Sequence, residues 1–236
     1  MMFICVLSMS ACLSIPKSIK NSFTYCYDGK YTGIDTLINI DGYYLAISIK
    51  ENIKAIGGFL DARLGRCIDT TYTRIMFYNN GLMVYNMADI YYNYIKKEHL
   101  RKDVASFLQD FSENSEAVGA NDFYGNDWGR YIVCGDTIKV QRAHKSTSLN
   151  DAWVLREIWY KIIDKNTILC IDYFRLPTTT VPQVSRGENY LMNFIPIPAK
   201  PKPDKSWILK EKWFWCNESD WKAYMDSLKQ EKSKKK

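Results

Sequence analysis

Cysteine and histidine are the residue types of this chain whose spacing could indicate a zinc site. Apart from Cys5 and Cys12 near the N-terminus, the cysteines are Cys26, Cys67, Cys134, Cys170 and Cys216. These five are widely and irregularly spaced, no C-x-x-C motif occurs, and the chain has only two histidines, His99 and His144. The sequence therefore predicts no metal site. We expect most of these cysteines to be buried as small apolar residues. One disulfide is an alternative in an oxidising envelope, and the sequence does not assign its pair.

The short motifs of common enzyme classes do not occur in the sequence. We find no G-x-S-x-G, no H-E-x-x-H, no P-loop and no G-x-G-x-x-G after a strand. Carboxylates are common, but no local spacing singles out an acid–base pair. His144 follows a predicted strand beside Arg142 and Lys145, and we interpret it as an exposed surface histidine. We therefore expect a protein that is not an enzyme, with no catalytic residue and no cofactor.

Aromatic residues are the better indication of a binding site. The chain has 17 Tyr, 10 Phe and 7 Trp. Six residues of two central hairpins form the predicted ligand pocket: Trp128, Tyr131, Trp153, Glu157, Trp159 and Tyr173. Alternate residues between 153 and 160 are apolar on both faces, so one face can line a cavity while the other meets a helix. Glu157 or Arg156 would then supply a polar group, and ordinary core packing of the same rings is the alternative.

Cys12 follows a short apolar run, residues 3–11. The quartet Met9-Ser10-Ala11-Cys12 resembles a bacterial lipobox. The resemblance implies a signal peptide over residues 1–11, truncated because no Lys or Arg precedes the run, and a lipid on Cys12 that includes fatty acids such as palmitate. Residues 12–22 would then be a tether to the membrane. A buried N-terminal strand with two apolar cysteines is the alternative.

The net charge of +6 is concentrated at the C-terminus. The last eight residues, KQEKSKKK, contain five Lys and one Glu. We interpret them as a solvated basic tail, with attraction to anionic lipid headgroups as the functional alternative. No basic groove with interleaved aromatics stands out, so we expect no nucleic-acid partner.

Four predicted hairpins position these side chains. They turn at Asp41-Gly42, at Asn79-Asn80-Gly81, at Gly135-Asp136 and around Asp164-Lys165-Asn166. Four hairpins give eight strands joined locally, which predicts a mainly β, antiparallel sheet of about eight to ten strands. Because such a sheet cannot leave long edges open, we expect a closed barrel or a strongly curved sheet, with a β-sandwich as the competing architecture.

Other segments interrupt or follow the β domain, which is predicted to span residues 23–195. Apolar spacing predicts a helix over 97–111, and residues 52–71 are interpreted as a loop with a short strand. Residues 196–236 are predicted to contain a proline-rich connector, a strand in SWILKEKWFWC and a helix capped by Asn217 or Ser219. The connector is either a spacer between two units or a loop on the barrel surface.

The strand pairs WGRYIVCGDTIKVQ and EIWYKIIDKNTILCI resemble those of lipocalin-like, calycin-type lipoproteins of Bacteroidota. The similarity covers residues 72–173 and implies an up-and-down barrel behind the lipidated Cys12. Exported surface lipoproteins of that phylum carry acidic residues after the cysteine, and residues 13–22 contain none. The resemblance therefore implies a protein anchored in the cell envelope, at the periplasmic face of the outer membrane.

Two functions follow as hypotheses. The first is a membrane-anchored binding module whose barrel holds a small apolar or amphipathic ligand. The second is an envelope protein with a filled barrel that docks a partner protein through surface aromatics, with Trp207, Trp213 and Trp215 as the expected patch.

Overall fold

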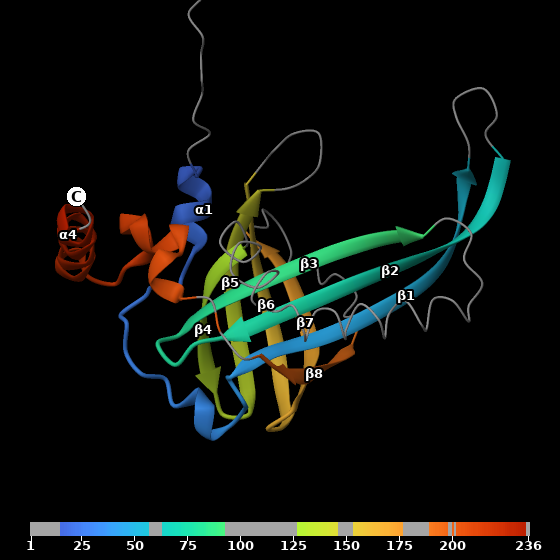
Figure 1. The fold of residues 1–236 in the computed structure, drawn as a ribbon, viewed down its shortest axis with the longest axis horizontal. Helices are drawn as coiled ribbons and strands as arrows, with labels where there is room; N and C mark the ends of the chain where they lie inside the picture. The colour runs from blue at the N-terminus through green and yellow to red at the C-terminus, as the bar shows by residue number, and fades with distance from the viewer. Residues whose placement is uncertain are drawn as a thin grey trace, which may run out of the picture.

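A closed barrel of eight antiparallel strands forms the centre of the protein. The computed structural model describes residues 15–56, 63–92, 127–145, 153–176, 189–197, 200 and 202–234. The strands are β1 (Gly42–Ile56), β2 (Arg63–Phe77), β3 (Leu82–Tyr92), β4 (Asp127–Cys134), β5 (Thr137–Lys145), β6 (Trp153–Asp164), β7 (Thr167–Leu176) and β8 (Tyr190–Pro196). Each strand pairs with the next, and β8 pairs with β1 (Figure 1). The predicted mainly β, barrel architecture is confirmed.

Three of the four predicted hairpin turns are confirmed, between β2 and β3, β4 and β5, and β6 and β7. Gly81 and Gly135 adopt the positive φ angles, 83° and 62°, that these turns require. The turn predicted at Asp41-Gly42 is wrong, because Gly42 begins β1. A Cβ at Gly42 would collide with the Ile195 carbonyl and the Phe194 ring, so glycine there permits the close approach of β8.

Residues on either side of Gly42 explain the error. The apolar residues before it form a 3-10 turn, η1 (Ile34–Thr36), whose Ile34 is fully buried in the barrel core. After it, β1 continues to Ile56 and pairs with β2 down to Arg63. The segment 52–71, predicted as a loop with a short strand, therefore belongs largely to two long strands.

The barrel is packed at one end, which we call the barrel base. It is the end closed by η1 and by the β4–β5 and β6–β7 turns (Figure 1). Four inward aromatic residues meet there: Tyr44, Phe77, Tyr131 and Tyr160. The Phe77 ring centroid lies 5.3 Å from that of Tyr131 and 6.2 Å from that of Tyr44. An eight-stranded barrel has an interior just wide enough for side chains to fill, and these rings fill the base.

The opposite end, which we call the barrel mouth, is less completely closed. Among the described residues, β3 pairs with β4 only as far as Tyr85 and Asp127, and β7 pairs with β8 only as far as Cys170 and Tyr190. Beyond this level β1, β2 and β3 continue as a curved arm that leaves the other strands (Figure 1).

Helical segments flank the barrel in sequence. They are α1 (Lys17–Ser22), η2 (Pro203–Lys205), η3 (Trp207–Lys210), η4 (Lys212–Phe214) and α4 (Glu218–Lys234). α1 packs on β6 and η3 on β4, whereas α4 packs on η3. Ile15 and Ile19 of the predicted tether are buried against Leu155 of β6, so the part of the tether from residue 15 onward lies on the barrel. At the other end of the barrel sequence, the proline-rich connector after β8 leads to η3 and η4, which pack on the barrel. It therefore does not lead to a separate unit.

The strand predicted in SWILKEKWFWC is wrong, because η3 and η4 occupy that segment. A closed barrel offers no free edge to which another strand could pair. The apolar residues Ile208, Leu209 and Phe214 are instead buried against the outer face of the barrel. The predicted last helix is confirmed as α4, with Trp221, Met225 and Leu228 half-buried along one side.

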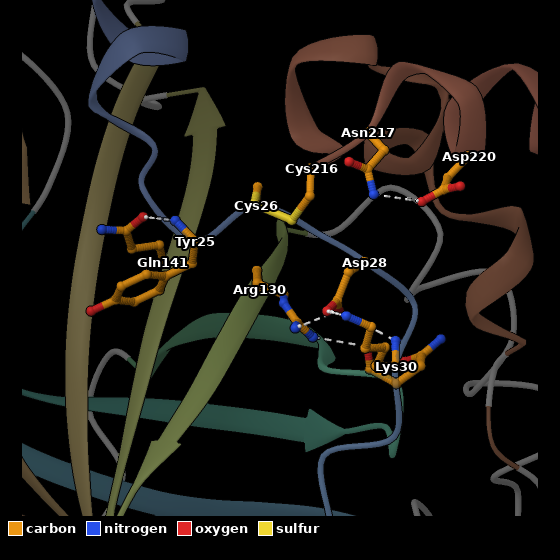
Figure 2. The surroundings of a disulfide bond; sticks show 10 residues. Tyr25, Cys26, Asp28, Lys30, Arg130, Gln141, Cys216, Asn217 and Asp220 are labelled. Atoms are coloured by element: carbon orange, nitrogen blue, oxygen red, sulfur yellow. Dashed lines mark hydrogen bonds and ion pairs between the residues drawn. A yellow bond between two sulfur atoms is a disulfide. The ribbon is translucent and has the colours of Figure 1, made fainter.

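A disulfide between Cys26 and Cys216 joins these N- and C-terminal segments across a sequence separation of 190 (Figure 2). Beside it, Tyr27 and Trp215 form a parallel bridge in which the Tyr27 N–H donates to the Phe214 carbonyl at 2.7 Å. The Cys216 N–H donates in return to the Tyr27 carbonyl at 2.9 Å. The disulfide that the sequence left unassigned is thus a clamp between the two ends of the chain.

Several predictions lie outside the described residues. These are the signal peptide and lipidated Cys12 at residues 1–12, and the helix at 97–111. In the part of the chain that is described, no helix is long and apolar enough to cross a bilayer.

Candidate functional site

Three arginines lie side by side on the inner face of the barrel, near its mouth. Arg142 of β5 is the cross-strand partner of Arg156 of β6, and Arg156 is the partner of Arg175 of β7. Because side chains alternate between faces along a strand, Arg142 and Arg156 share the face of the buried core residues Val140 and Ile158. We call Arg142, Arg156 and Arg175 the arginine row.

A β-bulge brings the third arginine into this row. The register between β6 and β7 shifts between Trp159 and Tyr160, so that Tyr160 faces Cys170 and Trp159 faces Asp172. Ile171 is the extra residue. Without it, alternation from inward Cys170 would place Tyr173 and Arg175 on the outer face; with it, they face inward. Bulges commonly re-aim side chains in this way near functional sites.

Arg142 is the most deeply buried member of the row, with 3% of its surface exposed. Its guanidinium forms an ion pair with Asp127 at the start of β4 and lies 3.8 Å from the centroid of the Tyr85 ring. Burial alone lowers the pKa of Arg142, but Tyr85 and Asp127 outweigh it and the pKa is raised. Arg142 therefore stays charged, and its Nε has no hydrogen-bond partner among the described residues.

Arg156 is half-buried, and its guanidinium lies 4.7 Å from the centroid of the Tyr173 ring. Its pKa is lowered by burial and by the neighbouring charges of Arg142 and Arg175. Neither Arg156 nor Arg175 forms an ion pair with a described residue, and Arg175 is exposed. Within the described residues, the three guanidinium groups thus have one carboxylate partner, Asp127, which pairs with Arg142.

His144 lies one inward position beyond Arg142 on β5, opposite Val154. It was predicted as an exposed surface histidine, and this is wrong: it is half-buried, and its Nδ1 has no partner in the described part of the chain. Burial and the charges of the arginine row lower the pKa of His144 to about 3. The imidazole is therefore neutral near pH 7 and can act as an acceptor or donor, but adds no charge.

The arrangement suits the binding of an anion better than it suits catalysis. Arginine presents N–H donors in a planar fork that matches carboxylate and phosphate oxygens. The rings of Tyr85 and Tyr173 lie beneath two of the guanidiniums and shield them from water. Within the described residues no group of three His, Cys, Asp or Glu side chains could hold a metal ion.

The six residues of the predicted pocket divide between the two faces of the barrel. Tyr131 and Tyr173 face inward, Tyr131 in the base and Tyr173 beside the arginine row. Four others face outward: Trp128, Trp153, Glu157 and Trp159. Trp128 stacks on Tyr78 beneath the C-terminal segment, and Trp153 packs on Trp207. The structure therefore does not bring the six residues together.

Glu157 is the centre of a polar network on the outer wall. It accepts hydrogen bonds from the Tyr25 hydroxyl at 3.1 Å, from Gln141 Nε2 at 2.7 Å and from the Trp159 indole at 2.6 Å. Gln141 in turn accepts the backbone N–H of Thr24 at 2.8 Å. Glu157 thus fixes the N-terminal segment to the barrel, and Arg156 is the one of the two predicted polar groups that faces inward.

Trp207, Trp213 and Trp215 were expected as a docking patch if the protein binds a partner through its surface. They are partly buried and pack against the outer core clusters rather than forming an open surface. The indole N–H groups of Trp213 and Trp215 donate to Glu211 and to the Leu209 carbonyl. These tryptophans hold the C-terminal segment on the barrel.

Comparison with protein-family models, with curated proteins and with solved structures finds no match to this chain. The lipocalin-like resemblance of its hairpins stays a prediction.

Proposed function

We propose that this protein is a membrane-anchored binding module whose barrel mouth holds a small amphipathic ligand. The observation that carries the proposal is the change in character along the inner face. Aromatic rings fill the barrel base, whereas the mouth carries the arginine row, of which only Arg142 is paired with a carboxylate of a described residue. Small-ligand sites are built in this way, with apolar and aromatic walls and a few convergent polar groups.

The membrane anchor in this proposal is Cys12, and the compartment is the bacterial envelope at the periplasmic face of the outer membrane. The Cys26–Cys216 disulfide supports an oxidising compartment, because disulfides persist there and are rare where thiols are kept reduced. Ile15 is buried on the barrel wall, so a lipid on Cys12 would hold the barrel close to the membrane surface.

A filled barrel that serves as a docking protein is the second candidate, and the packed base favours it. The two candidates differ in whether the mouth takes up a small molecule. We expect purified protein to bind one molecule of the neutral probe 1-aminoanthracene per chain, with a saturable rise in fluorescence that octanoate reverses. Uptake that does not saturate, or none, would favour the docking protein.

Substitution Cys12→Ser tests the anchor separately. We expect labelled palmitate to be incorporated into the wild-type protein and not into the variant, which should move to the soluble fraction because two or more acyl chains are needed for stable anchoring. Cys134→Ser is the matched control, since Cys134 is an exposed free thiol. Membrane retention of the Cys12→Ser variant would count against this anchor.

A further inference from the structure

The arginine row places like charges directly opposite one another, which is unfavourable for the isolated protein. Arg142, Arg156 and Arg175 are successive cross-strand partners. Like charges at directly opposed positions of a sheet destabilise it, and the cost grows where the groups are withdrawn from water. The barrel nevertheless turns all three inward, one of them by means of the bulge at Ile171.

The groups around the row compensate only part of its charge. Asp127 pairs with Arg142, and Tyr85 and Tyr173 supply ring faces. His144 is neutral, so the described residues leave more than one positive charge unpaired at the mouth.

Three polar atoms of the row and its neighbour His144 are also incomplete. Nε of Arg142, Nε of Arg156 and Nδ1 of His144 are buried and have no hydrogen-bond partner in the described part of the chain, and Arg142 as a whole is 97% buried. Unsatisfied buried polar atoms are rare in folded proteins and call for an explanation. An anion with several acceptor oxygens would supply both the missing charge and the missing acceptors.

We propose that the polar end of the ligand is an oxyanion, a carboxylate or a phosphate, bound between Arg156 and Arg175 and flanked by Arg142. This inference rests on the proposed function and names the chemical class of its ligand. Arg142 is held by Asp127, and no described carboxylate pairs with Arg156 or Arg175, so these two guanidiniums form the new ion pair. The ligand's apolar part then lies against the rings of Tyr85 and Tyr173 rather than in the base, which is already filled.

The test is competition against bound 1-aminoanthracene by three compounds with the same chain: octanoate, octyl phosphate and octanol. We expect the two anions to bind at least tenfold more tightly than octanol, with the stronger of the two identifying the head group. The double substitution Arg156→Met and Arg175→Met should weaken binding of the anions about 10- to 100-fold and leave octanol unchanged, because a hydrogen bond to a charged group contributes about 1.5–3 kcal/mol.

Lys161→Met is the matched control, since Lys161 is on the outer face of the same strand, β6, and is half-exposed. It removes one positive charge without touching the interior, and we expect no change in any affinity. Equal affinity for octanol and the two anions, unchanged in the double variant, would overturn the oxyanion inference and leave the binding module standing. Failure of the probe and of all three compounds to bind would overturn both.

Discussion

Two tyrosines in the packed interior differ in how completely their hydroxyl groups are hydrogen-bonded. The Tyr131 hydroxyl donates to the Tyr78 carbonyl at 2.6 Å and lies 2.7 Å from the Thr32 hydroxyl. The Tyr160 hydroxyl is equally buried but has no partner among the described residues. Burial raises the pKa of both phenols, so both are neutral and differ only in hydrogen bonding.

The substitution Tyr131→Phe should therefore destabilise the protein, and Tyr160→Phe should not. We expect a loss of about 1–2 kcal/mol in the free energy of unfolding for the first, because it removes a buried hydrogen bond to the Tyr78 carbonyl and the contact with the Thr32 hydroxyl, and a change near zero or a gain for the second. Urea unfolding of both variants measures the difference. Equal losses would mean that the Tyr160 hydroxyl has a partner after all.

His144 gives the protein a pH dependence with a definite sign. Its pKa in the folded protein is about 3, against about 6.5 in an unfolded chain. Protons therefore bind preferentially to the unfolded state, and the contribution of His144 to stability, complete above pH 6.5, is lost as the pH falls toward 3. The charges responsible face it from β5, β6 and β7, in Arg142, Arg156 and Arg175.

We expect wild-type protein to lose about 1–2 kcal/mol more stability than a His144→Gln variant between pH 7 and pH 4, after allowance for partial exposure of the imidazole. Urea unfolding at both pH values gives the comparison. Asp127, whose pKa is raised by burial, titrates in both proteins, so its contribution cancels in the comparison. An identical pH dependence of stability in the two proteins would show that His144 binds protons equally well in the folded and unfolded states.

At the scale of the elements, the β2–β3 hairpin is fixed by an arginine from a neighbouring strand. Arg130 of β4 donates to the Asn80 carbonyl at 2.8 Å and pairs with Asp28 of the N-terminal segment at 3.1 Å. Its guanidinium occupies the space where a Cβ on Gly81 would lie. Gly81 is thus required both for its positive φ and for this contact.

Gly135 provides a matched comparison, because it has a positive φ but no atom within 4 Å of its Cβ position. We expect Gly135→Ala to cost about 1 kcal/mol for the left-handed backbone. Gly81→Ala should cost about 3 kcal/mol, since it adds a collision with Arg130 to the same strain. Thermal unfolding measures both, and equal costs would mean that Arg130 moves aside freely.

At the scale of the whole molecule, residues 23–27 and 213–216, which flank the barrel in sequence, pack together in a single layer on its outer wall. The Phe23 ring lies 5.3 Å from Trp213 and 5.4 Å from Phe214, centroid to centroid. Tyr27 stacks on Phe214 at 5.5 Å. The Cys26–Cys216 disulfide closes this layer covalently. In the sequence, all the barrel strands lie between these two cysteines.

Reduction of this disulfide, or the double substitution Cys26→Ser and Cys216→Ser, should lower the free energy of unfolding by about 2–5 kcal/mol, because a long loop is released in the unfolded chain. Cys134→Ser is the control and should change nothing. Unfolding curves with and without dithiothreitol measure the effect. Curves that do not differ would mean that the two segments hold together through packing alone.

Local patterns in the sequence determined most of the barrel. Turn residues such as Asn80-Gly81 and Gly135-Asp136 specify tight reversals wherever they occur, and alternation over 153–160 requires a strand with two distinct faces. Antiparallel strands joined in this way must close or be covered, so a barrel or curved sheet could be predicted, although periodicity did not separate it from a β-sandwich. The turn predicted at Gly42 is wrong because this glycine permits the close approach of β8. The sequence does not distinguish a glycine required for a turn from one required for close packing.

Only the tertiary structure decided which face of each strand is inside. Alternation groups Arg156 with Ile158 and Glu157 with Trp159, but both groups are partly apolar, so burial could not be assigned from one strand. The arginine row depends on the register of three strands and on a bulge at Ile171, and the disulfide joins residues 190 positions apart. These features arise from pairing between segments that are distant in sequence, and periodicity within a segment carries no information about its partner.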